Sequence, residues 1–136
     1  MLLTINPLLT GELLKFLDEM GHSDYLVVVD ANFPAHRIGP PVVEIPGVDA
    51  VTVTAAVREV FPLDGDNPPA LMESGLNPRP AVQEELLTAA GTSTCTMVDR
   101  WAYYELASRA AVIVATGELR VWANVALYKG LCHLPV

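Results

Sequence analysis

The chain has 136 residues, of which 51% are hydrophobic and 18% charged, and it carries a formal net charge of −8 at pH 7. This length predicts a single domain over residues 1–136, and the negative charge, without a cluster of Lys and Arg, makes nucleic acid an unsuitable partner. No apolar run approaches the roughly 20 residues that a membrane-spanning helix requires, so no membrane partner is expected.

The first elements predicted along the chain are a helix and a buried strand. Residues 12–20 carry an apolar stripe at helical spacing, with Thr10 suited to cap the helix and Gly21 suited to end it. Residues 25–29 form a continuous apolar run bounded by polar residues, which is typical of a strand that is buried on both faces.

Prolines and turn-forming residues dominate the next part of the chain. Residues 31–41 are rich in proline and predict a loop without regular structure. Residues 42–45 predict a short strand, and residues 51–61 predict a helix in spite of the β-branched residues at its start. Residues 64–69 predict a turn, and residues 70–72 predict another short strand.

Helices and strands continue to alternate in the carboxyl-terminal half. Helices are predicted over residues 81–90, between Pro80 and Gly91, and over residues 101–109. The strands predicted in this half cover residues 94–98, 110–115 and 124–128. This alternation predicts an α/β layered fold with a largely parallel sheet.

The apolar excess and the cysteines bear on assembly and compartment. Average soluble domains are about 45–50% apolar and about 25% charged, so we expect this chain to bury additional apolar surface against copies of itself. The amino terminus lacks the basic segment of a signal peptide. Cys95 and Cys132 form neither a disulfide framework nor a metal-type spacing, and a reducing, cytoplasmic location is therefore expected.

Polar residues follow two of the predicted strands, which is where open α/β sheets bind their ligands. Asp30 comes directly after the first strand, and Asp99 and Arg100 come after a later one. Each residue also has a simple structural explanation. The aspartates suit turns or helix caps, and Arg100 can pair with Asp99 or Glu105 on the surface.

Two histidines lie near the first of these strands. His22 stands just before it, and His36 lies in the proline-rich loop. A histidine near a helix end often interacts only with the helix dipole. A metal site made of His22, Asp30 and His36 is conceivable from the ligand types, but the spacing matches no recognised pattern. The sequence contains no nucleotide-binding glycine motif and no Gly-x-Ser-x-Gly elbow, so no cofactor is expected.

Three blocks of sequence resemble the L-fucose mutarotase and D-ribose pyranase family. The first runs from Met20-Gly21-His22-Ser23-Asp24 through the apolar strand to Asp30-Ala31-Asn32-Phe33-Pro34-Ala35-His36. The second is Asp99-Arg100-Trp101-Ala102-Tyr103-Tyr104-Glu105, and the third extends from Thr116-Gly117-Glu118 to Asn124. The resemblance covers nearly the whole chain and is weakest between residues 63 and 91.

The resemblance implies a fold, an assembly and a set of functional residues. The fold would be a three-layer α/β/α arrangement around a mostly parallel, mixed sheet. The assembly would be a ring-shaped homo-oligomer, commonly a decamer, with active sites shared between neighbouring subunits. The implied roles are acid/base catalysis by His22, sugar binding by Asp30, Arg100, Trp122, Ala123 and Asn124, and a place near the pocket for His36 and Tyr104.

Two positions bear on the substrate. Arg100 stands where fucose-type members of the family carry Arg and ribose-type members carry His, which indicates the fucose branch. Trp122 stands where the family carries Tyr. Because an indole donates one hydrogen bond and accepts none, that tyrosine contact is not kept unchanged, although the indole can stack on a sugar ring.

Mutarotation suits a histidine. Opening a hemiacetal removes a proton from the anomeric hydroxyl and delivers one to the ring oxygen, and an imidazole can do both because its ordinary pKa is about 6.5. Asp30, if it lies near His22, would orient the imidazole or accept a hydroxyl. The alternatives are a non-catalytic monosaccharide-binding protein, a metal-dependent aldose–ketose isomerase, and an inactive assembly scaffold.

Overall fold

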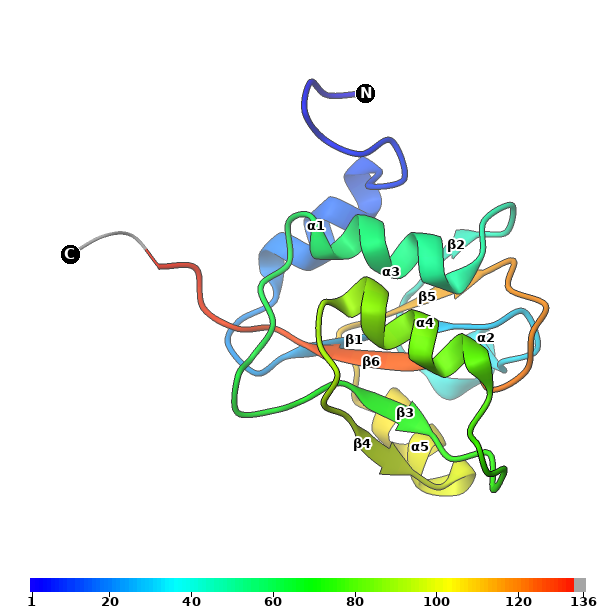
Figure 1. The fold of residues 1–136 in the computed structure, drawn as a ribbon. Coiled ribbons are helices and arrows are strands. Elements are labelled where there is room, and N and C mark those ends of the chain that lie inside the picture. Colours follow the sequence, from blue (N-terminus) through cyan, green and yellow to red (C-terminus); the bar gives the residue numbers. More distant parts are fainter. Residues whose placement is uncertain (134–136) are drawn as a thin grey trace.

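The computed structural model describes residues 1–133 and contains one mixed sheet (Figure 1). The strands are β1 (Tyr25–Val29), β2 (Val42–Ile45), β3 (Ala70–Met72), β4 (Thr96–Val98), β5 (Val112–Thr116) and β6 (Val125–Tyr128). Their order across the sheet is β2-β5-β1-β6-β3-β4. The pairings are parallel except that β6 runs antiparallel to both of its neighbours, β1 and β3.

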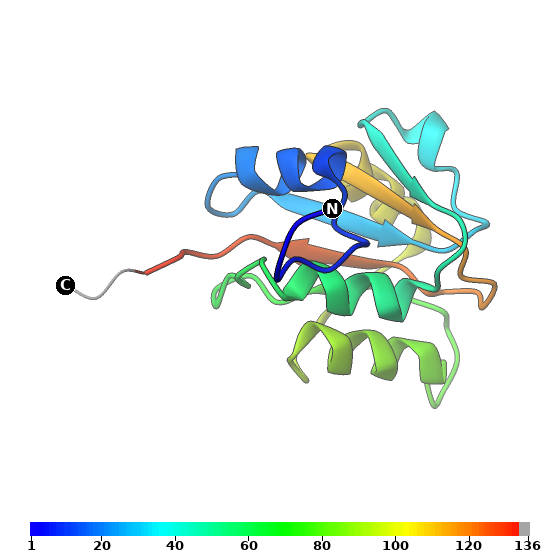
Figure 2. The same cartoon turned by 90° about the horizontal axis from the view of Figure 1, so that it is seen from above.

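Helices cover both faces of this sheet (Figure 2). The core on one face includes residues of α1 (Gly11–Glu19), α3 (Ala50–Arg58) and α4 (Ala81–Ala90). The core on the other face includes residues of α2 (Ala35–Ile38) and α5 (Arg100–Ser108). The predicted three-layer α/β/α fold with a mostly parallel, mixed sheet is confirmed. No helix within residues 1–133 has the length and apolarity that crossing a membrane demands.

The central strand β1 is buried on both faces, as its apolar run predicts. Leu26 and Val28 contribute to the core under α1, α3 and α4, whereas Val27 and Val29 contribute to the core under α5. Side chains alternate between the faces of a strand, so a strand between two helical layers needs apolar residues at every position.

Local sequence explains where two of the helices begin. Thr10 accepts a hydrogen bond from the Leu13 N–H and caps α1. Asp99 accepts hydrogen bonds from the N–H groups of Trp101 and Ala102 and caps α5. Asp99 therefore acts as a helix cap, and Arg100 becomes the first residue of the helix.

The prediction of an irregular loop over residues 31–41 is wrong in one part. The short helix α2 begins directly after Pro34, whose ring fixes a backbone torsion that is compatible with a helix start. Gly39 ends α2 in a positive-φ conformation. The remaining predicted elements are present, with ends that agree or differ by at most three residues. The strand predicted over 94–98, for example, begins only at Thr96.

Candidate functional site

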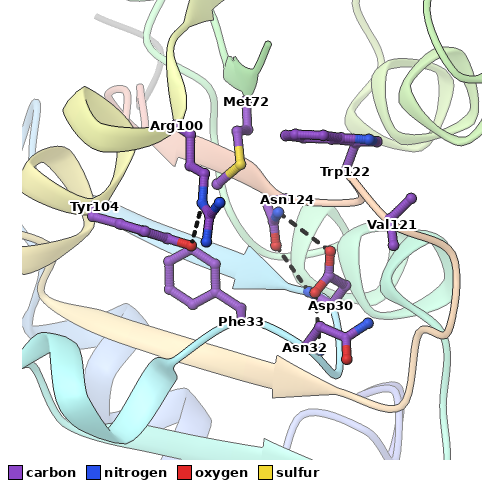
Figure 3. A pocket seen from close by; sticks show the side chains of 9 residues that line it. All are labelled: Asp30, Asn32, Phe33, Met72, Arg100, Tyr104, Val121, Trp122 and Asn124. Atoms are coloured by element: carbon purple, nitrogen blue, oxygen red, sulfur yellow. Dashed lines mark hydrogen bonds between the residues drawn. The ribbon is translucent and has the colours of Figure 1, made fainter. Parts of the chain in front are cut away.

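A pocket lies where the carboxyl ends of β1 and β3 meet the start of β6 and the start of α5 (Figure 3). Nine residues line it: Asp30, Asn32, Phe33, Met72, Arg100, Tyr104, Val121, Trp122 and Asn124. Five of the residues that the resemblance implicated, namely Asp30, Arg100, Tyr104, Trp122 and Asn124, are thus brought together from distant parts of the sequence.

Asp30 and Asn124 form the polar floor of the pocket. The Asn124 side-chain oxygen accepts from the Asp30 N–H at 2.9 Å, and the Asn124 Nδ2 donates to the Asp30 carboxylate at 3.3 Å. The Asn32 N–H also donates to this carboxylate, at 3.0 Å. Burial raises the pKa of Asp30 above its ordinary value, against the lowering effect of the Asn124 amide and of the backbone N–H groups of Asn32, Ala123 and Phe33. A carboxylate has about four lone-pair sites, and within residues 1–133 Asn32 and Asn124 are the two donors at hydrogen-bonding distance, so the carboxylate can also accept from a ligand hydroxyl.

Arg100 is held at the pocket by aromatic neighbours. Its Nε donates to the Tyr104 hydroxyl at 3.0 Å, and its guanidinium carbon lies 4.9 Å from the Trp101 ring centre and 5.6 Å from that of Tyr104. These contacts restrain a long side chain and leave the terminal nitrogens available to a ligand (Figure 3). Arg100 thus contacts Tyr104 and Trp101 instead of the surface partners Asp99 or Glu105 considered from the sequence.

Aromatic and apolar side chains form the walls. The half-buried indole of Trp122 lies on one side of the pocket, and Phe33 and Tyr104 lie on the other, with their ring centres 5.4 Å apart (Figure 3). Apolar walls above a polar floor suit a small ligand that presents both C–H faces and hydroxyl groups.

Two residues implicated by the resemblance lie beside the pocket rather than on its surface. Ala123 is fully buried, and its backbone N–H is directed at the Asp30 carboxylate. His36 is exposed on α2, lines a neighbouring hollow that also reaches Asp30, and places its Nε2 2.7 Å from the Glu44 carboxylate.

His22 lies at the opposite end of β1 from Asp30. It belongs to the turn before the strand, where the Ser23 N–H donates to the Lys129 carbonyl at 2.8 Å. The five residues of β1 separate this turn from Asp30, a span of roughly 17 Å along the strand. The imidazole is half exposed, with 48% of its side chain accessible. Within one chain, therefore, Asp30 does not orient the His22 ring.

The neighbour of His22 is Asp64, a residue that sequence analysis treated only as part of a turn. The Asp64 Oδ2 lies 3.5 Å from the His22 Nε2, and the Asp64 side chain is only 3% exposed. Ser23 Oγ and Asn67 Nδ2 donate to the same carboxylate at 3.0 and 2.8 Å. The sequence indicates only that Asp64 suits a turn. It does not indicate the contact with Ser23, because the two residues are 41 positions apart.

Close backbone packing brings Asp64 to this place. The Asp64 N–H donates to the Tyr128 carbonyl at 2.9 Å, and the Gly130 N–H donates to the Pro62 carbonyl at 2.8 Å. A Cβ atom at Gly130 would lie 2.3 Å from the Leu63 carbonyl oxygen, so only glycine allows the two segments to approach so closely. The end of β6 therefore sets the position of the carboxylate beside His22.

Asp64 makes folding stability depend on pH. The Asn67 amide, with the Asp66 N–H and Ser23, lowers the pKa of Asp64 from 3.8 to about 2. Because the folded-state pKa lies below the unfolded one, the stabilisation is complete above pH 3.8 and is lost as the pH falls toward 2.

We expect Asp64→Asn to lower the urea midpoint at pH 7. The difference in midpoint from the unsubstituted protein should narrow between pH 4 and pH 2.5. Asp66→Asn, at an exposed neighbour, is the control; an equal gap for both variants would contradict the assignment.

The candidate metal ligands are not assembled in one chain. His22 lies at the amino end of β1, and Asp30 and His36 lie at its carboxyl end. Across residues 1–133, no group of three or more His, Cys, Asp or Glu side chains is arranged to hold a metal ion.

Comparison with known proteins gives matches over almost the whole chain. The RbsD / FucU transport protein family matches residues 3–132. The fucose mutarotase of Streptococcus pneumoniae, solved in complex with L-fucose, is 31% identical with a TM-score of 0.88, over 97% of this chain and 100% of that one. FucU from Bifidobacterium longum is 36% identical with a TM-score of 0.86, over 95% and 99%.

The fold extends to a more distant structure. RbsD of Bacillus subtilis, solved in complex with D-ribose, superimposes with a TM-score of 0.77 over 92% of this chain and 95% of that one. At 18% identity, this match bears on the fold alone.

Proposed function

We propose that this chain, which belongs to the RbsD / FucU transport protein family, is a mutarotase that interconverts the anomers of a free monosaccharide. The observation that carries the proposal is the pocket of Figure 3, where Asp30, Arg100 and Asn124 present hydrogen-bonding groups beneath the Trp122 indole. The similarity to a fucose mutarotase over 97% of this chain and 100% of that one supports the same conclusion.

In the proposed mechanism, the pocket binds the sugar and an imidazole moves the protons. Asp30 accepts a sugar hydroxyl, and the terminal nitrogens of Arg100 donate to oxygens that become more negative as the ring opens. His22 takes the proton of the anomeric hydroxyl and returns one to the ring oxygen, and reclosure on the other carbonyl face reverses both transfers. Proton transfer by a positioned group typically contributes about 10²–10⁴-fold, which suits a reaction that already proceeds slowly in water.

Asp64 has a part in this mechanism. Its carboxylate is ionised at neutral pH and faces Nε2 of His22, so it favours a proton on that nitrogen and leaves Nδ1 for the sugar. When the ring accepts a second proton, the same carboxylate faces the positive charge that forms.

The separation of His22 from the pocket leads us to propose that each site is completed by His22 of a neighbouring subunit. The half-exposed imidazole is accessible to another copy. Apolar side chains for such contacts are available: Met1, Leu2, Leu3, Leu119, Val121 and Leu131 are all exposed. A ring in which each chain supplies an imidazole to one neighbour satisfies this geometry, and a decamer is the size that the family resemblance favours.

The proposed substrate is L-fucose or a related sugar, and exchange between pyranose and furanose forms is included because ring opening is common to both. The direct test is saturation-transfer NMR on L-fucose, D-ribose, D-galactose and L-rhamnose. We expect catalytic amounts of protein to accelerate anomer exchange most for L-fucose, without added metal. Acceleration of none of these sugars would contradict the proposal.

One observation favours a second candidate, a monosaccharide-binding protein without catalysis. The pocket is complete as a binding site within one chain, whereas the imidazole is elsewhere. Under this alternative, the protein binds L-fucose in equilibrium titrations but leaves the rate of anomer exchange unchanged. The NMR experiment therefore separates the two functions.

A further inference from the structure

Behind the pocket, the side chain of Gln83 on α4 contacts the backbone of two residues that line it. We propose that Gln83 is a positioning residue that fixes the Trp122 indole, and that it thereby sets the preference of the site among monosaccharides. This inference rests on the proposed function and extends it from reaction type to substrate selection.

The hydrogen bonds of Gln83 join two separate parts of the pocket. Its Nε2 donates to the Met72 carbonyl at 2.7 Å and to the Trp122 carbonyl at 3.1 Å, and the residue is fully buried. Met72 ends β3, whereas Trp122 lies in the loop before β6. One amide group thus holds the end of a strand and the indole-bearing loop at a fixed separation.

Trp122 needs such a restraint because of its backbone conformation. Its φ is +68°, in the left-handed region that bulky residues adopt rarely and that persists only where surrounding contacts impose it. The loop is also anchored two residues earlier, where Arg120 pairs with Glu118 at 3.0 Å and with Glu85 of α4. Gln83 is the α4 side chain that acts at Trp122 itself.

The amide of Gln83 has one unsatisfied atom. Its Oε1 is buried and has no hydrogen-bond partner, a condition that is costly for a polar atom. A methionine would fill a similar volume without that penalty. The two N–H donations to pocket-lining carbonyls are the evident compensation, since both involve the same Nε2.

Fixing the indole matters most for sugars that use it. An indole stacks on a continuous C–H face, which L-fucose presents together with its methyl group. D-ribose, a pentose without that methyl group, offers less surface to the same wall. If the Trp122 loop loosens, affinity for the deoxyhexose should therefore fall more than affinity for the pentose, whereas proton transfer should be affected little.

The test compares Gln83→Met with Thr54→Val. The Thr54 Oγ1 is the other buried, unpartnered side-chain atom found among residues 1–133, and it lies on α3 away from the pocket lining. For Gln83→Met, we expect KM for L-fucose to rise about tenfold, KM for D-ribose to rise less than about threefold, and both kcat values to stay within about threefold. Thr54→Val should leave all four constants unchanged. Gln83→Glu, which can donate at most one hydrogen bond when protonated, should give an intermediate effect.

A double-mutant comparison distinguishes positioning from general destabilisation. If Gln83 acts through the indole, Gln83→Met should have no further effect on KM in a Trp122→Ala background. In a Trp101→Phe background, where Trp122 is the one remaining tryptophan, Gln83→Met should also shift the emission spectrum. Additive effects on KM, or equal changes for Gln83→Met and Thr54→Val, would overturn the inference.

The same measurements separate this inference from the proposed function. If the unsubstituted protein accelerates no anomer exchange, the mutarotase proposal fails, and the ratio of L-fucose to D-ribose dissociation constants still tests Gln83. If exchange is accelerated but that ratio is the same with and without Gln83→Met, the positioning role alone is wrong.

Discussion

Replacing His22 with alanine is expected to reduce the rate of anomer exchange by about 10²–10⁴-fold, the range typical of a positioned acid/base group. Sugar affinity should change by less than about threefold, because the hydrogen bonds that hold the sugar are assigned to Asp30, Arg100 and Asn124 and the role of His22 is proton transfer. Saturation-transfer NMR measures the exchange, and equilibrium titration measures the affinity. His133→Ala, at an exposed histidine, is the control. Unchanged exchange in His22→Ala would exclude His22 as the proton carrier.

A mixing experiment tests whether the imidazole comes from a neighbouring subunit. His22→Ala and Asp30→Asn chains are each expected to keep at most a few per cent of the activity when assembled alone. After co-refolding in equal amounts, about a quarter of the sites should combine an intact pocket from one chain with an intact His22 from the other. Activity should return to about that fraction. No recovery from co-assembled chains would show that both groups act within the same chain.

The second large effect is expected for Asp30→Asn, which we predict to reduce kcat/KM about 30- to 1,000-fold. The substitution removes the charged acceptor for a sugar hydroxyl, and losing a hydrogen bond to a charged group is costly. It also places a second amide close to Asn124 Nδ2, which currently donates to the carboxylate. Both effects disturb binding before catalysis, so KM should rise as well as kcat fall.

The matched control for Asp30→Asn is Asp18→Asn, which makes the same change of charge at an exposed position on α1. A circular dichroism spectrum and a urea midpoint verify that each variant folds. A kcat/KM for Asp30→Asn within about threefold of the unsubstituted value would exclude Asp30 as a sugar ligand.

Much of the fold could be predicted because its signals are local. The run Tyr25–Val29 is apolar at every position, so it predicts a strand between two layers without any knowledge of its neighbours. The helix over Ala81–Ala90 is marked by Pro80 and Gly91, and the structure has the same bounds. In the proline-rich segment, the prolines lie before and after α2 and none lies inside it. Composition alone does not distinguish such a short helix from a loop.

Some residues of the candidate site could likewise be predicted from local sequence, and others could not. Asp30 and Arg100 follow strands, and the rule for ligand sites in α/β sheets identifies them from position. Gln83 and Asp64 carry no comparable signal, because their roles depend on contacts across 39 and 41 positions. The distance between His22 and Asp30 could not be predicted either. The two residues are only eight positions apart in the sequence, but they lie at opposite ends of β1.

The antiparallel course of β6 has a consequence for how the protein can evolve. This strand begins beside the pocket of Figure 3 and ends beside the His22 turn. Under the proposed mechanism, each chain therefore offers a binding surface at one end of β6 and an imidazole for a neighbouring subunit at the other. If the pocket meets an imidazole only between subunits, catalysis depends on self-association, and the two properties cannot evolve independently. A substitution that weakens self-association would then abolish anomer exchange even if each chain still folds and keeps its pocket intact.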